Sequence, residues 1–301
     1  MSIIAKLINL GLKMSGMKKK YSLPEEQFLA EIRQMNKSRG FFMPKNKKAV
    51  YKEHQVCGNQ VLVVQKAEKT AQRAVLYFFG GGMMIGPDKG DVDVIVRLVN
   101  QIGCDVWFPI YPLCTDHCIT EAFDMALECY RQMIGIYGAG NVSTCGFSSG
   151  GALALGVAAH INARGEQLPM PRCIVAVSPG EVPWNDAERA IMKENNPKDM
   201  MVDYVFMERV KKFEKQGRED VPEYMIHISK GDLTGVGRIH FYWSEDEVLY
   251  GARQNFIDAC ETYGVTYTVK TRPGMIHCYP MLPYYREAKE DFAEIMAYLA
   301  E

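Results

Sequence analysis

The sequence predicts an α/β fold, with a mostly parallel central sheet flanked by helices and a helical cap over one end of it. Short apolar runs alternate with segments of helical length over residues 74–178 and again over 239–299, which is typical of a parallel sheet covered on both faces. Residues 184–235 break this alternation, because they are charged, contain several methionines and have a helical pattern without an obvious strand. We interpret them as an insertion that forms part of the cap.

The length and composition favour one large domain. A chain of 301 residues is about the size at which a single core stops growing, and 48% of its residues are apolar. The 35 basic and 36 acidic residues nearly cancel, so neither a nucleic acid nor another polyanion is expected as a partner. Nine scattered cysteines without CxxC pairs predict free thiols in a reducing cytoplasm. The composition leaves open whether the protein forms a homo-oligomer.

Residues 1–45 are predicted to form N-terminal helices of the cap. Apolar residues in the first ten positions fall near helical spacing, and Lys6 and Lys13 interrupt the apolar stretch, which is unlike a signal peptide. We favour a helix packed on the protein over an anchor at a membrane surface. A second helix is predicted over residues 24–35, with Ser22 as a candidate cap. No run of 18 apolar residues occurs, so no membrane-spanning segment is expected.

The main domain is predicted to comprise residues 46–183 and 236–301. Two strands, 50–56 and 60–65, flank Gly58-Asn59 and form a hairpin. The apolar run 74–79 is typical of a buried central strand. Further strands are predicted at residues 105–111, 142–147, 172–178, 239–243 and 266–271, and helices at 88–102, 120–137, 150–164, 250–263 and 284–299.

A serine lies at a predicted turn between a strand and a helix. Residues 146–150 (GFSSG) match G-x-S-x-G, with an apolar strand before them and a helix of small residues after them. Such a sharp turn needs small residues on both sides of the serine, and it holds the hydroxyl above the edge of the sheet. Ser148 is therefore the candidate nucleophile. The alternative is that Ser148 only caps the following helix.

A serine hydroxyl needs a general base, and in this arrangement an acid and then a histidine follow the serine along the chain. His277 comes directly after the strand 266–271, in a loop at the end of a strand. The other histidines fall in predicted strands, helices or the insertion, or beside Asp116 and Cys118, where three adjacent residues cannot converge on one metal ion. No metal site is expected. The orienting acid is sought among the three carboxylates of residues 244–249 (SEDEVL).

Three glycines follow the predicted central strand. Acyl transfer develops negative charge on a carbonyl oxygen, and backbone N–H groups must approach it closely to stabilise that charge. Glycine allows this close approach because it has no side chain. Residues 80–82 (GGG) are therefore a candidate oxyanion-binding loop.

Together these motifs resemble the hormone-sensitive-lipase branch of the α/β-hydrolases, a family of esterases, over about residues 70–300. Residues 79–82 (FGGG) are similar to the HGGG motif of that family, and residues 111–117 (YPLCTDH) to its YRLAPEH segment. Residues 146–151 (GFSSGG) resemble GDSAGG, and residues 274–277 match its final G-x-x-H. The helical cap of the family, built from the N-terminus and an insertion, corresponds to residues 1–45 and 184–235.

The resemblance implies a site and a reaction. It implies an oxyanion hole made by the N–H groups of Gly81, Gly82 and Ser149. It also implies an acid followed by x-Leu, which is Glu247 in this chain. With Ser148 and His277 this gives hydrolysis of small to medium acyl esters through an acyl-enzyme, with no cofactor and a small-molecule ester as the partner. Hydrolysis of small amides on the same triad and a non-catalytic ligand receptor are the alternatives.

Three positions depart from the family pattern. Phe79 stands in place of the first histidine of HGGG, Phe147 in place of the elbow aspartate, and Pro112 in place of the arginine of YRLAPEH. None of them is a member of the triad or an oxyanion donor. They affect the expected preorganisation of the loops, and hence the rate, more than the class of reaction.

Overall fold

The computed structural model of the protein describes residues 11–12, 17–39, 47–67, 70–282 and 285–301. Its centre is an eight-stranded sheet with the order β1-β2-β4-β3-β5-β6-β7-β8. From β4 to β8 all neighbouring strands in this order are parallel, and the β1–β2 hairpin joins β4 in the antiparallel direction. The predicted α/β class and mostly parallel sheet are therefore confirmed. The strands are β1 Val50–Val56, β2 Asn59–Gln65, β3 Ala74–Phe78, β4 Asp105–Pro109, β5 Val142–Phe147, β6 Ile174–Val177, β7 Arg238–Ser244 and β8 Thr266–Arg272.

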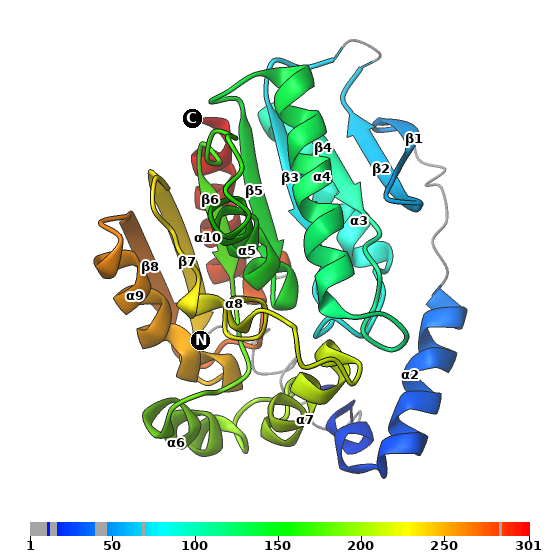
Figure 1. Cartoon of the computed structure of the whole chain (residues 1–301), viewed down its shortest axis with the longest axis vertical. Helices are drawn as coiled ribbons and strands as arrows, with labels where there is room; N and C mark the ends of the chain where they lie inside the picture. Colours follow the sequence, from blue (N-terminus) through cyan, green and yellow to red (C-terminus); the bar gives the residue numbers. More distant parts are fainter. Residues whose placement is uncertain (1–10, 13–16, 40–46, 68–69, 283–284) are drawn as a thin grey trace.

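Helices cover both faces of the sheet (Figure 1). Helices α3 and α10 pack on one face, and α4 and α5 pack on the other. The α-helices are α2 Glu25–Arg39, α3 Lys89–Ile102, α4 Ile119–Tyr137, α5 Ser149–Ala163, α6 Asp186–Asn195, α7 Tyr204–Lys215, α8 Glu223–Ile226, α9 Arg253–Thr262 and α10 Arg286–Ala300. Short 3-10 helices are η1 Met17–Ser22, η2 Ile228–Lys230, η3 Val248–Ala252 and η4 Tyr279–Met281.

The edge hairpin differs from the prediction by one residue. Its turn consists of Cys57 and Gly58, and Asn59 already pairs with Val56 in the ladder. The two turn residues have φ values of 50° and 74°, as a two-residue turn that matches the strand twist requires. The Asn59 side chain donates to the Cys57 carbonyl at 2.9 Å. Asn59 therefore stabilises the turn from the first position of β2.

In its described part, the N-terminal segment has helices with bounds that differ from those predicted. Residues 17–22 are a 3-10 helix, and α2 extends to Arg39, beyond the predicted end at residue 35. The apolar positions among the first ten residues lie outside the described residues. None of the described helices is long and apolar enough to cross a membrane.

Helix α7 of the insertion packs against the N-terminal segment (Figure 1). The Tyr21 and Phe206 rings lie 5.0 Å apart, and the Phe28 and Phe213 rings 5.8 Å apart. The guanidinium of Arg209 donates to the carbonyls of Tyr21 and Leu23. These contacts join two segments that are nearly 200 positions apart in the chain, at the carboxyl end of the parallel strands.

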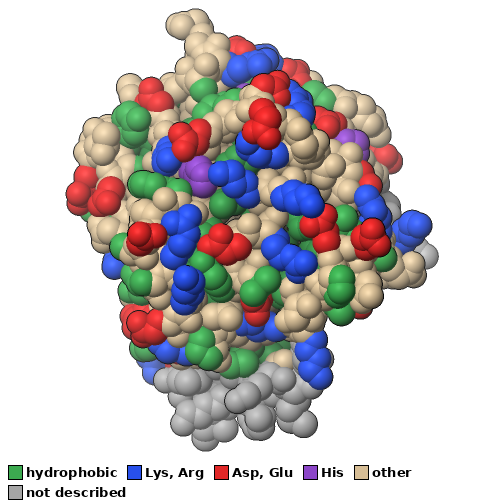
Figure 2. Space-filling model, turned by 60° about the horizontal axis from the view of Figure 1, so that its bottom comes forward, with side chains coloured by type: hydrophobic (Ala, Val, Ile, Leu, Met, Phe, Trp, Pro, Cys, Tyr) green, Lys and Arg blue, Asp and Glu red, His purple; other side chains and the backbone are tan. Residues whose placement is uncertain are grey.

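The surface around these helices has a mixed charge. Figure 2 shows basic and acidic side chains interspersed on this face, without a patch of a single sign. Ion pairs such as Lys212–Glu25 and Lys198–Glu194 account for part of this pattern. The face therefore has no field that would attract a polyanion.

All nine cysteines are free thiols, and all except Cys57 are buried.

Candidate active site

Ser148 occupies a strained turn between β5 and α5. Its φ of 56° and ψ of −128° are unusual for a residue with a side chain. A Cβ atom on Gly146 would lie 2.0 Å from the Gly150 carbonyl oxygen, and one on Gly150 would lie 2.3 Å from the Phe78 and Phe79 carbonyl oxygens. Only glycine fits at either position. The two glycines therefore permit the turn that lifts Ser148 above the strand ends.

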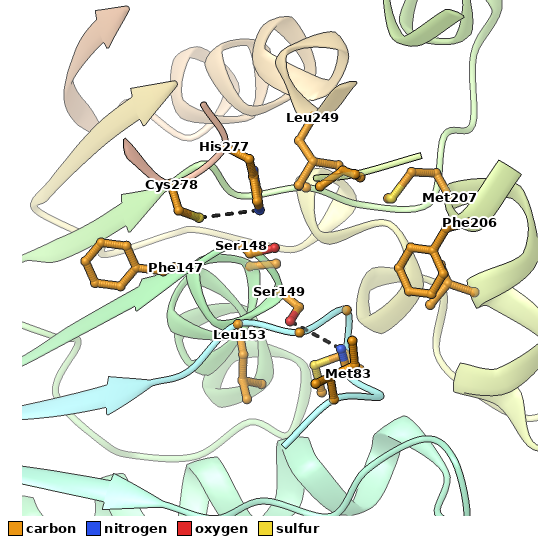
Figure 3. Close-up of a pocket in the computed structure, with 18 of the residues that line it drawn as sticks. Met83, Phe147, Ser148, Ser149, Leu153, Phe206, Met207, Leu249, His277 and Cys278 are labelled. Atoms are coloured by element: carbon orange, nitrogen blue, oxygen red, sulfur yellow. Dashed lines mark hydrogen bonds between the residues drawn. The ribbon is translucent and has the colours of Figure 1, made fainter. Parts of the chain in front are cut away.

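The Gly80–Gly82 loop lies beside this turn. Gly81 and Gly82 have φ values of 119° and 60°, and a Cβ on Gly81 would lie 2.3 Å from the Ile85 carbonyl oxygen. The Met83 N–H donates to Ser149 Oγ at 3.2 Å, so the loop is tied to the first residue of α5 (Figure 3). Within the described residues, the N–H groups of Gly81, Gly82 and Ser149 donate to no other group. They are available to a ligand oxygen.

An aromatic stack supports the loop where the family pattern has a histidine. The Phe79 and Tyr111 rings stack with a centroid distance of 4.0 Å and an interplanar angle of 4°. The Tyr111 hydroxyl donates to the Phe79 carbonyl oxygen at 2.7 Å. Phe147, at the position of the elbow aspartate, is buried and packs on Tyr77. The sequence interpretation missed this support, because it treated Phe79 and Tyr111 separately.

His277 and Glu247 meet at the carboxyl end of the sheet. His277 Nδ1 lies 2.6 Å from Glu247 Oε2, and both side chains are buried. The other carboxylate oxygen, Oε1, accepts the Ser244 N–H at 3.1 Å. Glu247 follows β7 and His277 follows β8, so adjacent parallel strands place the pair.

The two neighbouring carboxylates have other partners. Asp246 accepts the N–H of Gly274, and Glu245 accepts the Thr271 hydroxyl. Both bonds tie the loop after β7 to the end of β8. Of the three candidate acids, the structure thus brings only Glu247 to His277.

Two side chains of the insertion hold the backbone around Glu247. The Asn195 amide donates to the carbonyl oxygens of Glu245 and Glu247 at 2.8 and 3.1 Å. Asp199 Oδ2 accepts the Val248 N–H at 2.8 Å. Asn195 and Asp199 are themselves buried. The position of Glu247 therefore depends on the insertion as well as on the sheet.

The second ring nitrogen of His277 faces a thiol. Cys278 has a positive φ of 55°, and its Sγ lies 3.4 Å from His277 Nε2. Figure 3 shows the imidazole beside Ser148, with its marked contact to Cys278. No hydrogen bond joins Ser148 to His277 among the described residues. The Cys278 thiol thus contacts Nε2, the nitrogen to which a serine hydroxyl would have to donate its proton.

The surroundings of His277 change its basicity. Burial alone lowers the pKa of His277, but the contacts with Cys278 and with the Glu247 carboxylate outweigh burial. The pKa of His277 therefore lies well above its usual value of 6.5. The carboxylate favours the charged imidazolium, as expected for a paired buried histidine.

The other histidines have structural partners. His117 lies 2.8 Å from Glu121, while the neighbouring Asp116 pairs with Arg33, so these adjacent residues do not converge on one point. No group of three metal-ligating side chains gathers within the described ranges. The remaining partners are Gln132 for His54, Tyr224 and Asp124 for His160, the Val182 carbonyl for His227, and Thr268 for His240.

Ser148 and His277 line one cavity of about 460 Å³. Its walls come from both parts of the fold: Leu153 and Phe147 from the main domain, and Phe206 and Met207 from α7 (Figure 3). A Cβ on Gly82 would lie 2.5 Å from the Phe206 ring, so α7 touches the glycine loop directly. The walls are mainly apolar, as in sites for small organic ligands.

Comparisons with known proteins agree with this architecture. A family model described as alpha/beta hydrolase fold matches residues 75–281. None of the curated proteins compared matches the chain.

Solved structures resemble the chain over nearly its whole length. An esterase/lipase from an uncultured bacterium has 19% identity and a TM-score of 0.82, covering 99% of this chain and 98% of that one. EstE5, soaked with p-nitrophenyl butyrate, has 19% identity and a TM-score of 0.82, with 100% and 98% coverage. A hormone-sensitive lipase from a metagenome library has 20% identity and a TM-score of 0.80, with 98% coverage of each chain.

Proposed function

Because this chain belongs to the α/β hydrolase fold family and is carboxylesterase-like in fold, we propose that it hydrolyses small to medium acyl esters through a Ser148 acyl-enzyme. The observation that carries the proposal is the buried Glu247–His277 pair, whose histidine lines the same cavity as the strained Ser148. A serine at such a turn, a histidine and a buried acid are the parts that nucleophilic acyl transfer needs.

In the first step, His277 Nε2 leaves Cys278 and accepts the proton of the Ser148 hydroxyl. The serine oxygen attacks the ester carbonyl, and the N–H groups of Gly81, Gly82 and Ser149 stabilise the oxyanion. Glu247 stabilises the imidazolium through Nδ1. His277 then donates the proton to the leaving alcohol as the carbon–oxygen bond breaks.

In the second step, water repeats the sequence on the acyl-enzyme. His277 takes a proton from the water, the hydroxide attacks the acyl carbon, and Ser148 leaves with the proton returned by His277. The products are a carboxylic acid and an alcohol. Every proton moves through His277, and no cofactor takes part.

We assign residues 46–183 and 236–301 to the catalytic domain, and residues 1–45 and 184–235 to the cap. The contacts of Tyr21 and Phe28 with α7 support this division, since they join the two cap segments. The contact of Phe206 with Gly82 supports a cap that closes the substrate cavity. Cleavage of small amides needs the same residues and stays the alternative reaction.

The experiment that tests the proposal is labelling with a serine-reactive fluorophosphonate, together with hydrolysis of p-nitrophenyl butyrate. EstE5 crystals were soaked with this ester. We expect one label, on Ser148, and loss of hydrolysis in proportion to labelling. A folded protein that neither reacts with the probe nor cleaves the ester contradicts the proposal and favours a non-catalytic receptor.

We expect kcat/KM to decrease on the acidic side of its pH profile at a higher pH than is usual for a histidine base. Only neutral His277 acts as a base, and its pKa is raised, so kcat/KM falls as the pH decreases through a value above 6.5. In Glu247→Gln the charge that stabilises the imidazolium is absent, and the decrease moves to lower pH. Measuring kcat/KM from about pH 5 to 10 checks both expectations. A wild-type decrease at or below pH 6.5 contradicts them.

A further inference from the structure

The last turn of α7 carries a buried carboxyl group that the proposed reaction does not use. Glu214 is 8% exposed, and it lines the same cavity as Ser148. It shares the cavity-facing side of the helix with Met207 and Val210, at spacings of seven and four residues. Acidic side chains on surface helices usually face water, so this position calls for an explanation.

One oxygen of the Glu214 carboxyl group has no hydrogen-bond partner in the described part of the chain. This oxygen, Oε2, is also buried. Leaving such a group unpaired costs free energy, which a bound ligand can recover by supplying a donor. By contrast, Glu181, which is also buried at this cavity, accepts bonds from Trp184, Ser229 and Asn255. Glu214 is therefore available to a ligand, and Glu181 is not.

The charges around the cavity favour a cation as that ligand. Three buried carboxyl groups line it, those of Glu181, Glu214 and Asp91. The basic side chains Lys20 and Arg39 belong to the N-terminal segment, and Arg39 pairs with Asp88 at the start of α3. Glu214 instead lies near the loop before α4, because Gln216, two residues further along, donates to the Cys114 carbonyl oxygen at 2.6 Å.

We propose that Glu214 binds an ammonium group on the substrate, so that the enzyme prefers esters that carry a primary amine at the far end of a chain. This inference rests on the proposed esterase function. Phe206 touches the glycine loop, and Glu214 is eight residues further along α7, or roughly 12 Å at 1.5 Å per residue. Because helical side chains lean toward the N-terminus, the ammonium should lie about 10 Å from the ester carbonyl.

The titratable groups near Glu214 are few. Lys211 is on the same helix, the Cys114 and Cys118 thiols lie in the loop before α4, and Glu121 is in the first turn of α4. Burial raises the pKa of Glu214 to about 8, with Lys211 opposing this effect. Burial also raises the pKa of the Cys114 thiol, so that it stays neutral. Ionisation of Glu214 is therefore the change expected in this part of the cavity between neutral and mildly basic pH.

The test compares esters that differ only in charge. An extended chain advances about 1.2 Å per bond, so eight bonds span roughly 10 Å. The p-nitrophenyl esters of 8-aminooctanoic and nonanoic acids place an ammonium or a methyl group at that distance on the acyl side. The butyrate esters of 6-aminohexanol and heptanol do so on the alcohol side, where the ester oxygen adds two of the eight bonds.

In one of the two series we expect wild type to prefer the cationic ester, and Glu214→Gln to lower that preference about tenfold or more, the usual value of a charged hydrogen bond. The neutral ester is the reference, because it measures any general effect of Glu214→Gln on the cavity. Glu208→Gln is the matched control, because Glu208 is on the same helix but exposed. It should leave the preference unchanged.

The pH dependence separates binding of a cation from a structural role. Between about pH 7 and 9, the preference of wild type should rise about tenfold as Glu214 ionises, since the free-enzyme pKa controls kcat/KM. In Glu214→Gln the preference should not depend on pH. A cavity that merely loosens in the variant would change both esters alike at every pH.

Two failures can be told apart. If wild type cleaves the neutral esters but Glu214→Gln leaves the cationic preference unchanged in both series, this inference is wrong and the proposed esterase function stands. If wild type cleaves none of these esters faster than Ser148→Ala does, the proposed function is contradicted, and the inference with it.

Discussion

Replacing Ser148 with alanine is expected to lower kcat for ester hydrolysis by about 10⁶-fold, because the nucleophile is lost and only substrate binding and the oxyanion donors remain. The fold should not change. The Ser148 hydroxyl makes no hydrogen bond to a described group, and the backbone of the turn is set by Gly146 and Gly150. Steady-state hydrolysis of p-nitrophenyl butyrate and circular dichroism measure the two effects.

Ser149→Ala is the matched control, because this serine is adjacent and keeps its backbone N–H. It loses the bond that its Oγ accepts from the Met83 N–H and the hydrogen bond of its side chain to Tyr111, so we expect a loss of about tenfold. Turnover of Ser148→Ala within tenfold of wild type, measured on protein free of wild-type contamination, would refute the assignment of the nucleophile.

Glu247→Gln is expected to lower kcat by about 10³- to 10⁴-fold. Glutamine keeps the size of the side chain but favours the wrong tautomer of His277 and cannot stabilise the imidazolium. The Glu247 side chain is fully buried, so water cannot substitute for the lost charge. The measurement is kcat at the pH optimum of each variant, which separates this loss from the shift of the pH profile.

Asp246→Asn is the comparison for the acid. Asp246 accepts the Gly274 N–H, and an asparagine oxygen can accept the same bond. We expect its kcat to stay within about tenfold of wild type, the value of one neutral hydrogen bond. If Asp246→Asn is the more damaging of the two changes, Glu247 is not the orienting acid.

The sheet could be predicted from the sequence because burial on both faces leaves a clear local pattern. The apolar run that forms β3 indicates a buried central strand. The glycines around Ser148 indicate a sharp turn. The loops after β7 and β8 could be predicted to lie side by side, because parallel strands end at the same edge of a sheet. The choice of Glu247 among three carboxylates needed the family resemblance.

Other parts of the site depend on contacts between distant segments. The stack of Phe79 on Tyr111 joins residues 32 positions apart, and the local sequence around either residue does not predict it. The contact of Cys278 with His277 depends on a positive φ that residues with a side chain seldom adopt. Glu214 looks like an ordinary charged residue of an amphipathic helix, and only its packing makes it unusual.

The hydrogen bonds of Asn195 and Asp199 to the backbone around Glu247 limit which replacements of the insertion this enzyme can accept. Exchanging the insertion for that of a relative is an obvious route to new specificity, but it would remove the two side chains that fix the backbone of the acid. We expect grafts that keep these two residues to retain kcat while their selectivity changes. On the proposed division into cap and catalytic domain, a change in the insertion that displaces Asn195 or Asp199 would also displace the acid.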